Sequence, residues 1–128
     1  MPLRDTLTLM VVDDMSVSRS LVEQALDDIG IQKVAFEREA TTALRRLAAN
    51  PTHLVLSDYN MPGMDGLSLL EALRSNASTQ RIGFILMTGR PDRSIISRGH
   101  LLGMNNFIAK PFTTQGLKGC IEKVVGAL

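Results

Sequence analysis

The sequence predicts a three-layer α/β domain with a five-stranded parallel sheet, and two features of its pattern indicate this class. Strand-length apolar runs alternate along the chain with amphipathic stripes at helical spacing. The runs are nearly continuous, as in parallel strands that are buried on both faces. Five strand–helix units with short, right-handed connections then place helices on both faces of the sheet. We treat residues 1–128 as one domain, because a chain of this length can bury a single substantial core.

The first half of the chain contains three of these units. Strands are predicted at residues 7–12, 34–36 and 53–57, the second with a weak signal. The first helix begins at Met15-Ser16 and ends at Gly30, and Asn50-Pro51 stops the second. The three helices carry the stripes Val22, Ala25, Leu26 and Ile29, then Ala40, Ala43, Leu44 and Leu47, then Leu69, Leu70 and Leu73.

The second half contains two further units, with strands at residues 83–88 and 106–109. A helix near 94–102 lies between these strands and carries Gly99 in its interior. An interior glycine costs about 1 kcal/mol relative to alanine, so this helix is predicted to be the least rigid. The last helix follows the stripe Leu117, Cys120, Ile121 and Val124.

Composition excludes several classes of function. The net charge of +1 gives no electrostatic basis for binding nucleic acid or a membrane surface, and no apolar run approaches the length of a bilayer span. Cys120 is the only cysteine, which rules out an internal disulfide, and its place in an apolar helical pattern indicates a buried thiol. We therefore expect a cytoplasmic protein, and a monomer, with no nucleic-acid partner and no membrane insertion.

Polar side chains stand where four of the predicted strands end: Asp13-Asp14, Asp58, Thr88 and Lys110. Because the carboxyl ends of parallel strands meet at one edge, these groups are expected to gather there. Three carboxylates, a hydroxyl and an ammonium suit a divalent metal and a phosphoryl group. Crowded carboxylates need a cation, and an environment of oxygen ligands alone points to Mg²⁺.

Each carboxylate also has a plainer interpretation. Asp58 at a strand end can act as a nucleophile that forms an aspartyl phosphate, or it can simply cap a loop. The pair Asp13-Asp14 can bind a metal or can form a capping cluster at the start of a helix, and the two roles can coexist.

Five short motifs along the chain match a known family. They are Val11-Val12-Asp13-Asp14, Asp58-Tyr59-Asn60-Met61-Pro62, Asp65-Gly66, Met87-Thr88 and Lys110-Pro111-Phe112. In this order and spacing the chain resembles the receiver domain of bacterial response regulators along essentially its whole length. Its compact length is most similar to stand-alone chemotaxis regulators of the CheY type. The resemblance implies a flavodoxin-like (βα)5 fold with strand order 2-1-3-4-5.

The resemblance also implies a metal and a phosphoacceptor. Asp58 would accept the phosphoryl group. Asp14, Asp58 and the backbone carbonyl of Asn60 would bind Mg²⁺ directly, and Asp13 would bind it mainly through water.

Three more residues have roles that the resemblance implies. Lys110, joined to Pro111 by a cis peptide bond, would place its ammonium against the phosphoryl oxygens. Thr88 would donate a hydrogen bond to the phosphoryl group, and Phe107 would turn inward as the threonine moves. Without the resemblance, the plainer interpretation of Lys110 is a solvated lysine, that of Thr88 is an ordinary strand threonine, and that of Phe107 is a core aromatic. The expected output surface is the fourth helix, the fifth strand and the fifth helix.

The function that follows is a signalling switch and not an enzyme in the usual sense. A sensor histidine kinase of the CheA kind would phosphorylate Asp58, and the switched face would bind a target such as the flagellar motor switch. A phosphate sink that draws phosphoryl groups from the kinase is the alternative. Arg90 stands where the family often has a carboxylate or amide, so the lifetime of the phosphoryl group and the need for a dedicated phosphatase stay open.

Two rivals belong to other classes. A phosphatase of the haloacid dehalogenase type combines similar residues, but it requires a second aspartate where this chain has Asn60, and there is no room for a cap domain. A flavodoxin-like nucleotide binder would have a glycine- and hydroxyl-rich phosphate loop after the first strand, which this sequence lacks.

Overall fold

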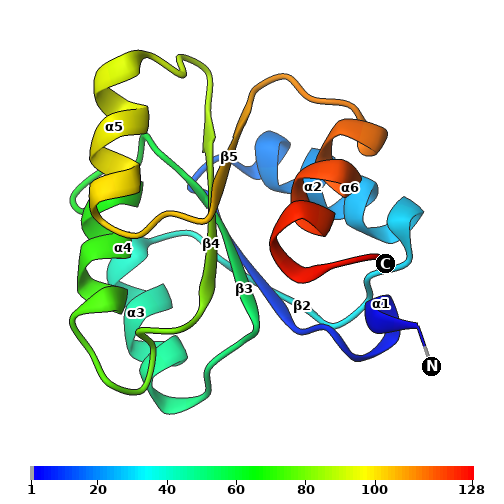
Figure 1. The fold of residues 1–128 in the computed structure, drawn as a ribbon, viewed down its shortest axis with the longest axis horizontal. Coiled ribbons are helices and arrows are strands. Elements are labelled where there is room, and N and C mark those ends of the chain that lie inside the picture. The colour runs from blue at the N-terminus through cyan, green and yellow to red at the C-terminus, as the bar shows by residue number, and fades with distance from the viewer. Residues whose placement is uncertain (1) are drawn as a thin grey trace.

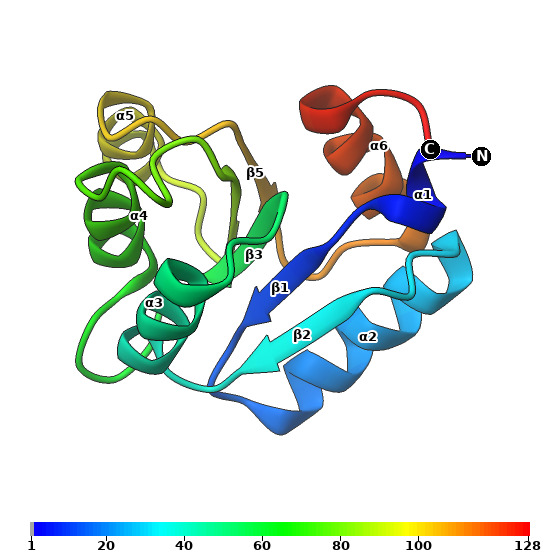
Figure 2. The ribbon, with the colours of Figure 1, turned by 90° about the horizontal axis from the view of Figure 1, so that it is seen from below.

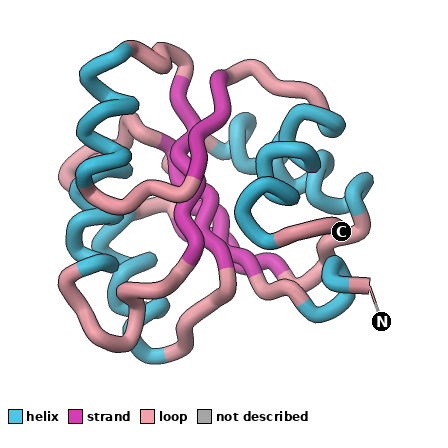
Figure 3. Tube along the Cα trace, in the orientation of Figure 1, coloured by secondary structure: helices cyan, strands magenta, loops and turns pink. Residues whose placement is uncertain are grey.

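The computed structural model describes residues 2–128 and has a parallel five-stranded sheet at its centre (Figures 1 and 3). The strands are β1 (Leu9–Val12), β2 (Val34–Glu37), β3 (Leu54–Asp58), β4 (Gly83–Thr88) and β5 (Asn106–Ala109). Their spatial order is β2-β1-β3-β4-β5, and every neighbouring pair is parallel. The predicted fold class and strand order are therefore confirmed.

Helices cover both faces of this sheet, as Figures 1 and 2 show from two directions. They are α1 (Leu3–Thr6), α2 (Ser16–Ile29), α3 (Ala40–Ala49), α4 (Gly66–Arg74), α5 (Arg93–Leu101) and α6 (Thr114–Val125). Helices α2 and α6 pack on one face, and α3, α4 and α5 lie on the other. Within residues 2–128, no helix has the length and apolar character needed to cross a membrane.

The sheet divides the core into two apolar layers. Along β1, Leu9 and Val11 face α2 and α6, whereas Met10 and Val12 face the other helices. Both sets are 0–1% exposed, which explains why the sequence shows a continuous apolar run in place of alternation. Cys120 lies in the α2–α6 layer at 8% exposed, as predicted, and burial raises the pKa of its thiol.

The outer strands depart from that pattern. β2 is only half-buried along its length, and β5 ranges from half-buried to exposed. Both are edge strands with one neighbour each, so one side of each strand is open to solvent. The partial exposure of β2 explains why the sequence gives only a weak strand signal there.

Helix ends follow local chemistry that the sequence carries. Gly30 closes α2 in the left-handed conformation with φ 98°, where glycine has no steric penalty. Side-chain oxygens of Asp65, Asp92 and Thr113 accept backbone N–H groups at the starts of α4, α5 and α6. The four-residue helix α1 was not predicted, because it is too short to show a stripe and has no buried residue.

Gly99 has a packing role that the sequence did not reveal. It is the only buried residue of α5, and a Cβ built there would lie 2.7 Å from the sulfur of Met104. Met104 itself is 6% exposed, so its side chain has little room to move aside. The absence of a side chain at Gly99 therefore lets Met104 pack directly against the α5 backbone.

This contact can be tested against a second helical glycine. Gly119 in α6 has open space where a Cβ would be, so Gly119→Ala should raise the free energy of unfolding by about 0.5–1 kcal/mol. Gly99→Ala should raise it by clearly less than Gly119→Ala or not at all, because the thioether end of Met104 must shift to make room for the new Cβ. Urea unfolding of both variants measures the difference, and equal stabilisation by the two would contradict the packing role.

Candidate functional site

The four polar positions of the sequence lie at one edge of the sheet. Asp13 follows β1, Asp58 ends β3, Thr88 ends β4 and Lys110 follows β5. The register of the parallel strands aligns their carboxyl ends, because Asp58 pairs with Met87 and Thr88 pairs with Ala109 in neighbouring strands. The edge is formed by the carboxyl ends of the strands, where open parallel sheets bind their ligands.

Three carboxylates form a cluster at this edge. Asp13, Asp14 and Asp58 each offer an oxygen, and these atoms all lie within 4.8 Å of one another. Asp13 is fully buried and Asp58 is 8% exposed, while Asp14 is half-buried. A set of hard oxygen donors this close together, partly removed from water, fits a divalent cation such as Mg²⁺.

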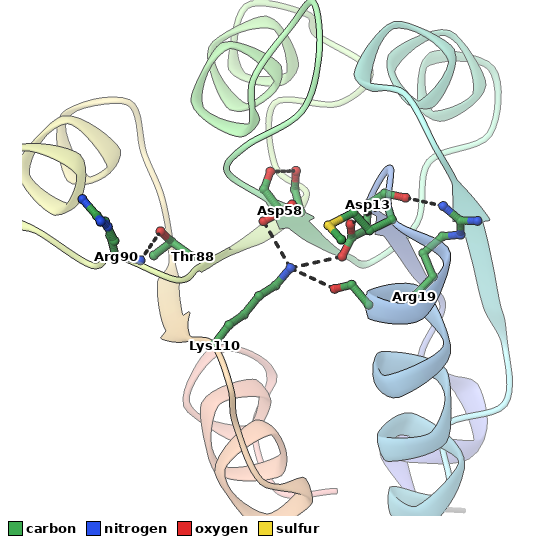
Figure 4. Close-up of polar contacts among 9 residues, drawn as sticks. Asp13, Arg19, Asp58, Thr88, Arg90 and Lys110 are labelled. Atoms are coloured by element: carbon green, nitrogen blue, oxygen red, sulfur yellow. Dashed lines mark hydrogen bonds and ion pairs between the residues drawn. The ribbon is translucent and has the colours of Figure 1, made fainter.

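Lys110 is the cation that the described residues themselves supply. Its Nζ lies 3.2 Å from Asp13 Oδ2, 3.2 Å from Asp58 Oδ1 and 2.9 Å from Ser18 Oγ (Figure 4). Its side chain is 23% exposed, so the charge is partly shielded from water. The Lys110–Pro111 peptide bond is cis, the geometry that the family resemblance implied.

Contacts from α2 hold the β1–α2 loop in place. Asp13 Oδ1 accepts the backbone N–H of Met15 at 3.1 Å, and Arg19 Nη1 donates to the backbone carbonyl of Asp13 at 2.7 Å. Asp13 thus makes a local contact at the start of the helix with one oxygen and an ion pair with the other. The contact with Met15 supports a local structural role for Asp13 and leaves its second oxygen facing the cluster, so a role in metal binding stays a prediction.

Burial and charge act in opposite directions on Asp58. Removal from water is the largest cause and raises its pKa, the ammonium of Lys110 lowers it, and the nearby carboxylate of Asp13 raises it. The net effect is a pKa above the ordinary value. In the metal-free fold the ionised form of Asp58 is therefore held at a cost, which a cation would relieve.

The hydroxyl of Thr88 is close to this edge but takes no part in the cluster. Thr88 is 2% exposed, and its Oγ1 accepts the backbone N–H of Arg90 at 3.1 Å. Figure 4 shows the hydroxyl turned toward Arg90, whose side chain extends away from Asp58 and Lys110.

The other two predicted residues, Asn60 and Phe107, lie close in the sequence to Asp58 and Lys110. Asn60 is exposed in the loop between β3 and α4, two residues beyond Asp58. Phe107 is half-buried in β5 and packs against the layer formed with α3, α4 and α5. The Sγ of Cys120 donates to the carbonyl of Phe107 at 3.5 Å, which ties this strand to α6.

Ser18 and Arg19 are site residues that sequence reasoning missed. Both lie in the first turn and a half of α2, directly after Asp13-Asp14. Their position in the sequence could have indicated this role, because side chains on a helix tilt toward its N-terminus and polar residues in this turn therefore point back to the sheet edge. Neither residue belongs to an apolar stripe, so the periodic pattern did not identify them.

Comparison with known proteins agrees with the fold and the site. The model of the response regulator receiver domain matches residues 9–122, so the chain belongs to that family. It is 38% identical over 128 residues to a probable chemotaxis protein CheY of Rhizobium etli, covering 100% of this chain and 99% of the relative. This chain is accordingly a CheY-like receiver domain, a signalling protein and not a classical enzyme, and its acidic cluster is typical of receiver domains. Family membership decides against both rivals considered above.

Solved structures give the same result for the fold. The chemotaxis protein CheY4 of Vibrio cholerae has a TM-score of 0.85 at 24% identity, with 92% of this chain and 98% of that chain covered. The receiver domain of sensor histidine kinase PA1611 from Pseudomonas aeruginosa has a TM-score of 0.85 at 23% identity, with 94% and 98% covered. That structure holds a magnesium ion in its active-site cleft.

The raised pKa of Asp58 predicts the stability of an uncharged variant. A carboxyl whose folded pKa exceeds its unfolded value binds more protons when folded, so stability falls as the pH rises between those two values. Asp58→Asn removes this cost and should raise the free energy of unfolding of the metal-free protein at neutral pH.

The gain should shrink as the pH falls through the folded pKa of Asp58, because the wild-type group then becomes neutral as well. Urea unfolding with a chelator at several pH values measures it. Adding Mg²⁺ at about 100 times its Kd should stabilise the wild type by about 2.7 kcal/mol and Asp58→Asn by much less. A variant less stable than the wild type at neutral pH without metal would contradict the argument.

Proposed function

We propose that this protein is a response regulator that Mg²⁺-dependent phosphorylation of Asp58 switches between two states. One observation carries the proposal: the Lys110 ammonium lies between Asp13 and Asp58, at the edge where three carboxylates meet. A phosphoryl group on Asp58 would bring further oxygens to the same ammonium. Phosphoryl transfer depends mainly on such positioning and charge stabilisation.

The residues present fit the metal. Asp14, Asp58 and the backbone carbonyl of Asn60 would hold Mg²⁺ directly, and Asp13 would hold it through water, in keeping with the preference of this ion for few carboxylates and several waters. When bound, the ion supplies charge that neutralises phosphoryl oxygens.

The chain's own residues perform the transfer. An ionised carboxylate oxygen of Asp58 attacks phosphorus, and a new P–O bond forms as the P–N bond to the phosphohistidine of the kinase breaks. The electron pair of the broken bond returns to the imidazole, which leaves as a neutral ring because its other nitrogen carries a proton in the reacting phosphohistidine. Lys110 donates to a phosphoryl oxygen as it becomes more negative.

The switch follows from the position of Thr88. Its hydroxyl now accepts the backbone N–H of Arg90 and has its own proton free, so it can donate to a phosphoryl oxygen on Asp58 and be drawn toward that group. A phosphate adds about −1.5 to −2 of charge and three acceptor oxygens, which outweighs one neutral hydrogen bond. Phe107 then moves into the space that the threonine leaves. This changes the shape of the expected output surface, which α5, β5 and α6 form as the fourth predicted helix, the fifth strand and the fifth predicted helix.

The relatives suggest the pathway. A probable chemotaxis protein CheY is the relative described above, so we assign a CheA-like kinase as phosphodonor and the flagellar motor switch, or another phosphorylation-dependent target, as receiver. A phosphatase could shorten the signal. The protein would act in the cytoplasm as a monomer, and a phosphate sink is the alternative role.

Removal of the phosphoacceptor tests the assignment. Asp58→Asn should abolish labelling by a phosphorylated kinase, because an amide cannot form the acyl phosphate, and a chelator should abolish labelling of the wild type. Asp28→Asn, on the exposed side of α2, is the control and should label normally. Acid-labile phosphate, followed on gels, is the measurement, and undiminished labelling of Asp58→Asn would refute the assignment.

The switch has its own test in Thr88. Thr88→Ala should accept phosphate but lose most of the phosphorylation-dependent gain in target affinity, whereas Thr88→Ser keeps the hydroxyl and most of the gain. Binding to candidate motor-switch proteins, with and without beryllofluoride, measures this. A wild type that gains no affinity for any target and turns its phosphate over quickly would instead identify a sink.

A further inference from the structure

The ammonium of Lys110 has three partners of two kinds. It donates hydrogen bonds to a carboxylate oxygen of Asp13 at 3.2 Å and to the neutral hydroxyl of Ser18 at 2.9 Å, and it forms an ion pair with Asp58 at 3.2 Å. A lysine ammonium has three N–H donors, so it can serve all three partners at once. The shortest contact is the one to the uncharged group, which belongs to α2.

These three contacts differ in what happens to them during the proposed reaction. The Asp58 oxygens become part of an acyl phosphate, and Asp13 belongs to the set that would hold the metal. Of the three partners, only the Ser18 hydroxyl belongs neither to the proposed metal site, which includes the water-mediated Asp13, nor to the phosphoryl group. It is therefore the one fixed point to which the Lys110 ammonium can stay bonded while the other two partners change.

Ser18 also has a rigid support. It lies in the first turn of α2, a 14-residue helix whose Val22, Ala25, Leu26 and Ile29 are buried in the core. Lys110, by contrast, is on a loop after an edge strand and carries four flexible methylenes. A hydroxyl fixed on a packed helix can limit where that long side chain places its charge.

We propose that Ser18 is a positioning residue for phosphoryl transfer, which holds the Lys110 ammonium over Asp58. This inference rests on the proposed function and adds to it a residue that does not itself touch the reacting atoms. Its effect passes through Lys110 alone. Loss of the hydroxyl leaves a charged donor short of one acceptor and lets the ammonium move.

The test compares variants at position 18 for Mg²⁺-dependent phosphorylation by acetyl phosphate. Ser18→Ala should slow labelling of Asp58 by about tenfold, the size of one hydrogen bond to a charged group. Ser18→Thr keeps the hydroxyl and should label at nearly the wild-type rate, whereas Ser18→Val matches the shape of threonine without the hydroxyl and should be slow. Ser20→Ala, exposed on the same helix, is the matched control.

A double-mutant cycle separates positioning from a structural effect on α2. In a Lys110→Ala background, Ser18→Ala should cause no further loss, because the group through which it acts is absent. The same double-mutant cycle is also measured at equilibrium, from the affinity of each of the four proteins for beryllofluoride. Tyr59 is the only tyrosine in a chain without tryptophan and follows Asp58 directly, so its fluorescence reports binding.

Each outcome has one meaning. Equal rates for Ser18→Thr and Ser18→Val, or an undiminished Ser18→Ala, would overturn the positioning role. A loss of the same size with and without Lys110 would assign Ser18 a structural role and also overturn it. A wild type that takes no label refutes the proposed function itself, whereas a labelled wild type with normal position-18 variants refutes only this inference.

Discussion

The arrangement depends on three carboxylates that are held together at a partly dry sheet edge with a single ammonium among them. Asp13 is fully buried and Asp58 nearly so, yet Lys110 supplies only one positive charge to the three groups. Removing like charges from water is expensive when they are not fully paired. The folded chain therefore keeps an unbalanced negative charge at the position where a metal ion and a phosphoryl group would meet.

Strand order explains why the cation is a lysine. In the order β2-β1-β3-β4-β5, β4 lies between Lys110 and the strand that ends in Asp58. Neighbouring strands are about 4.8 Å apart, so the backbones at Lys110 and Asp58 are separated by about 10 Å, and the two side chains close this gap together. The long stem of Lys110 covers most of the distance, and its flexibility is why a fixed hydroxyl such as that of Ser18 matters.

The sequence predicted the parts of this structure that repeat and missed those that depend on a single contact. Buried strands such as Gly83–Thr88 and stripes such as Leu117, Cys120 and Ile121 carry periodic signals, so class, order of elements and the acidic edge were predictable. Ser18 has no periodic signal, because its importance comes from a lysine 92 positions away. Gly99 was read as a source of flexibility, although its close contact with Met104 is visible only in three dimensions.

Arg90 departs from the usual family pattern, yet its side chain does not hold the Thr88 hydroxyl in the structure. Thr88 Oγ1 accepts from the main-chain N–H at position 90, and any residue except proline provides that donor. The arginine side chain is exposed and extends away from the acidic cluster. Its effect on a phosphoryl group would therefore act through charge over a distance and through solvent. In the proposed switch, the Arg90 side chain would therefore change the lifetime of the phosphoryl group without changing the hydrogen bond that holds Thr88 in the unphosphorylated protein.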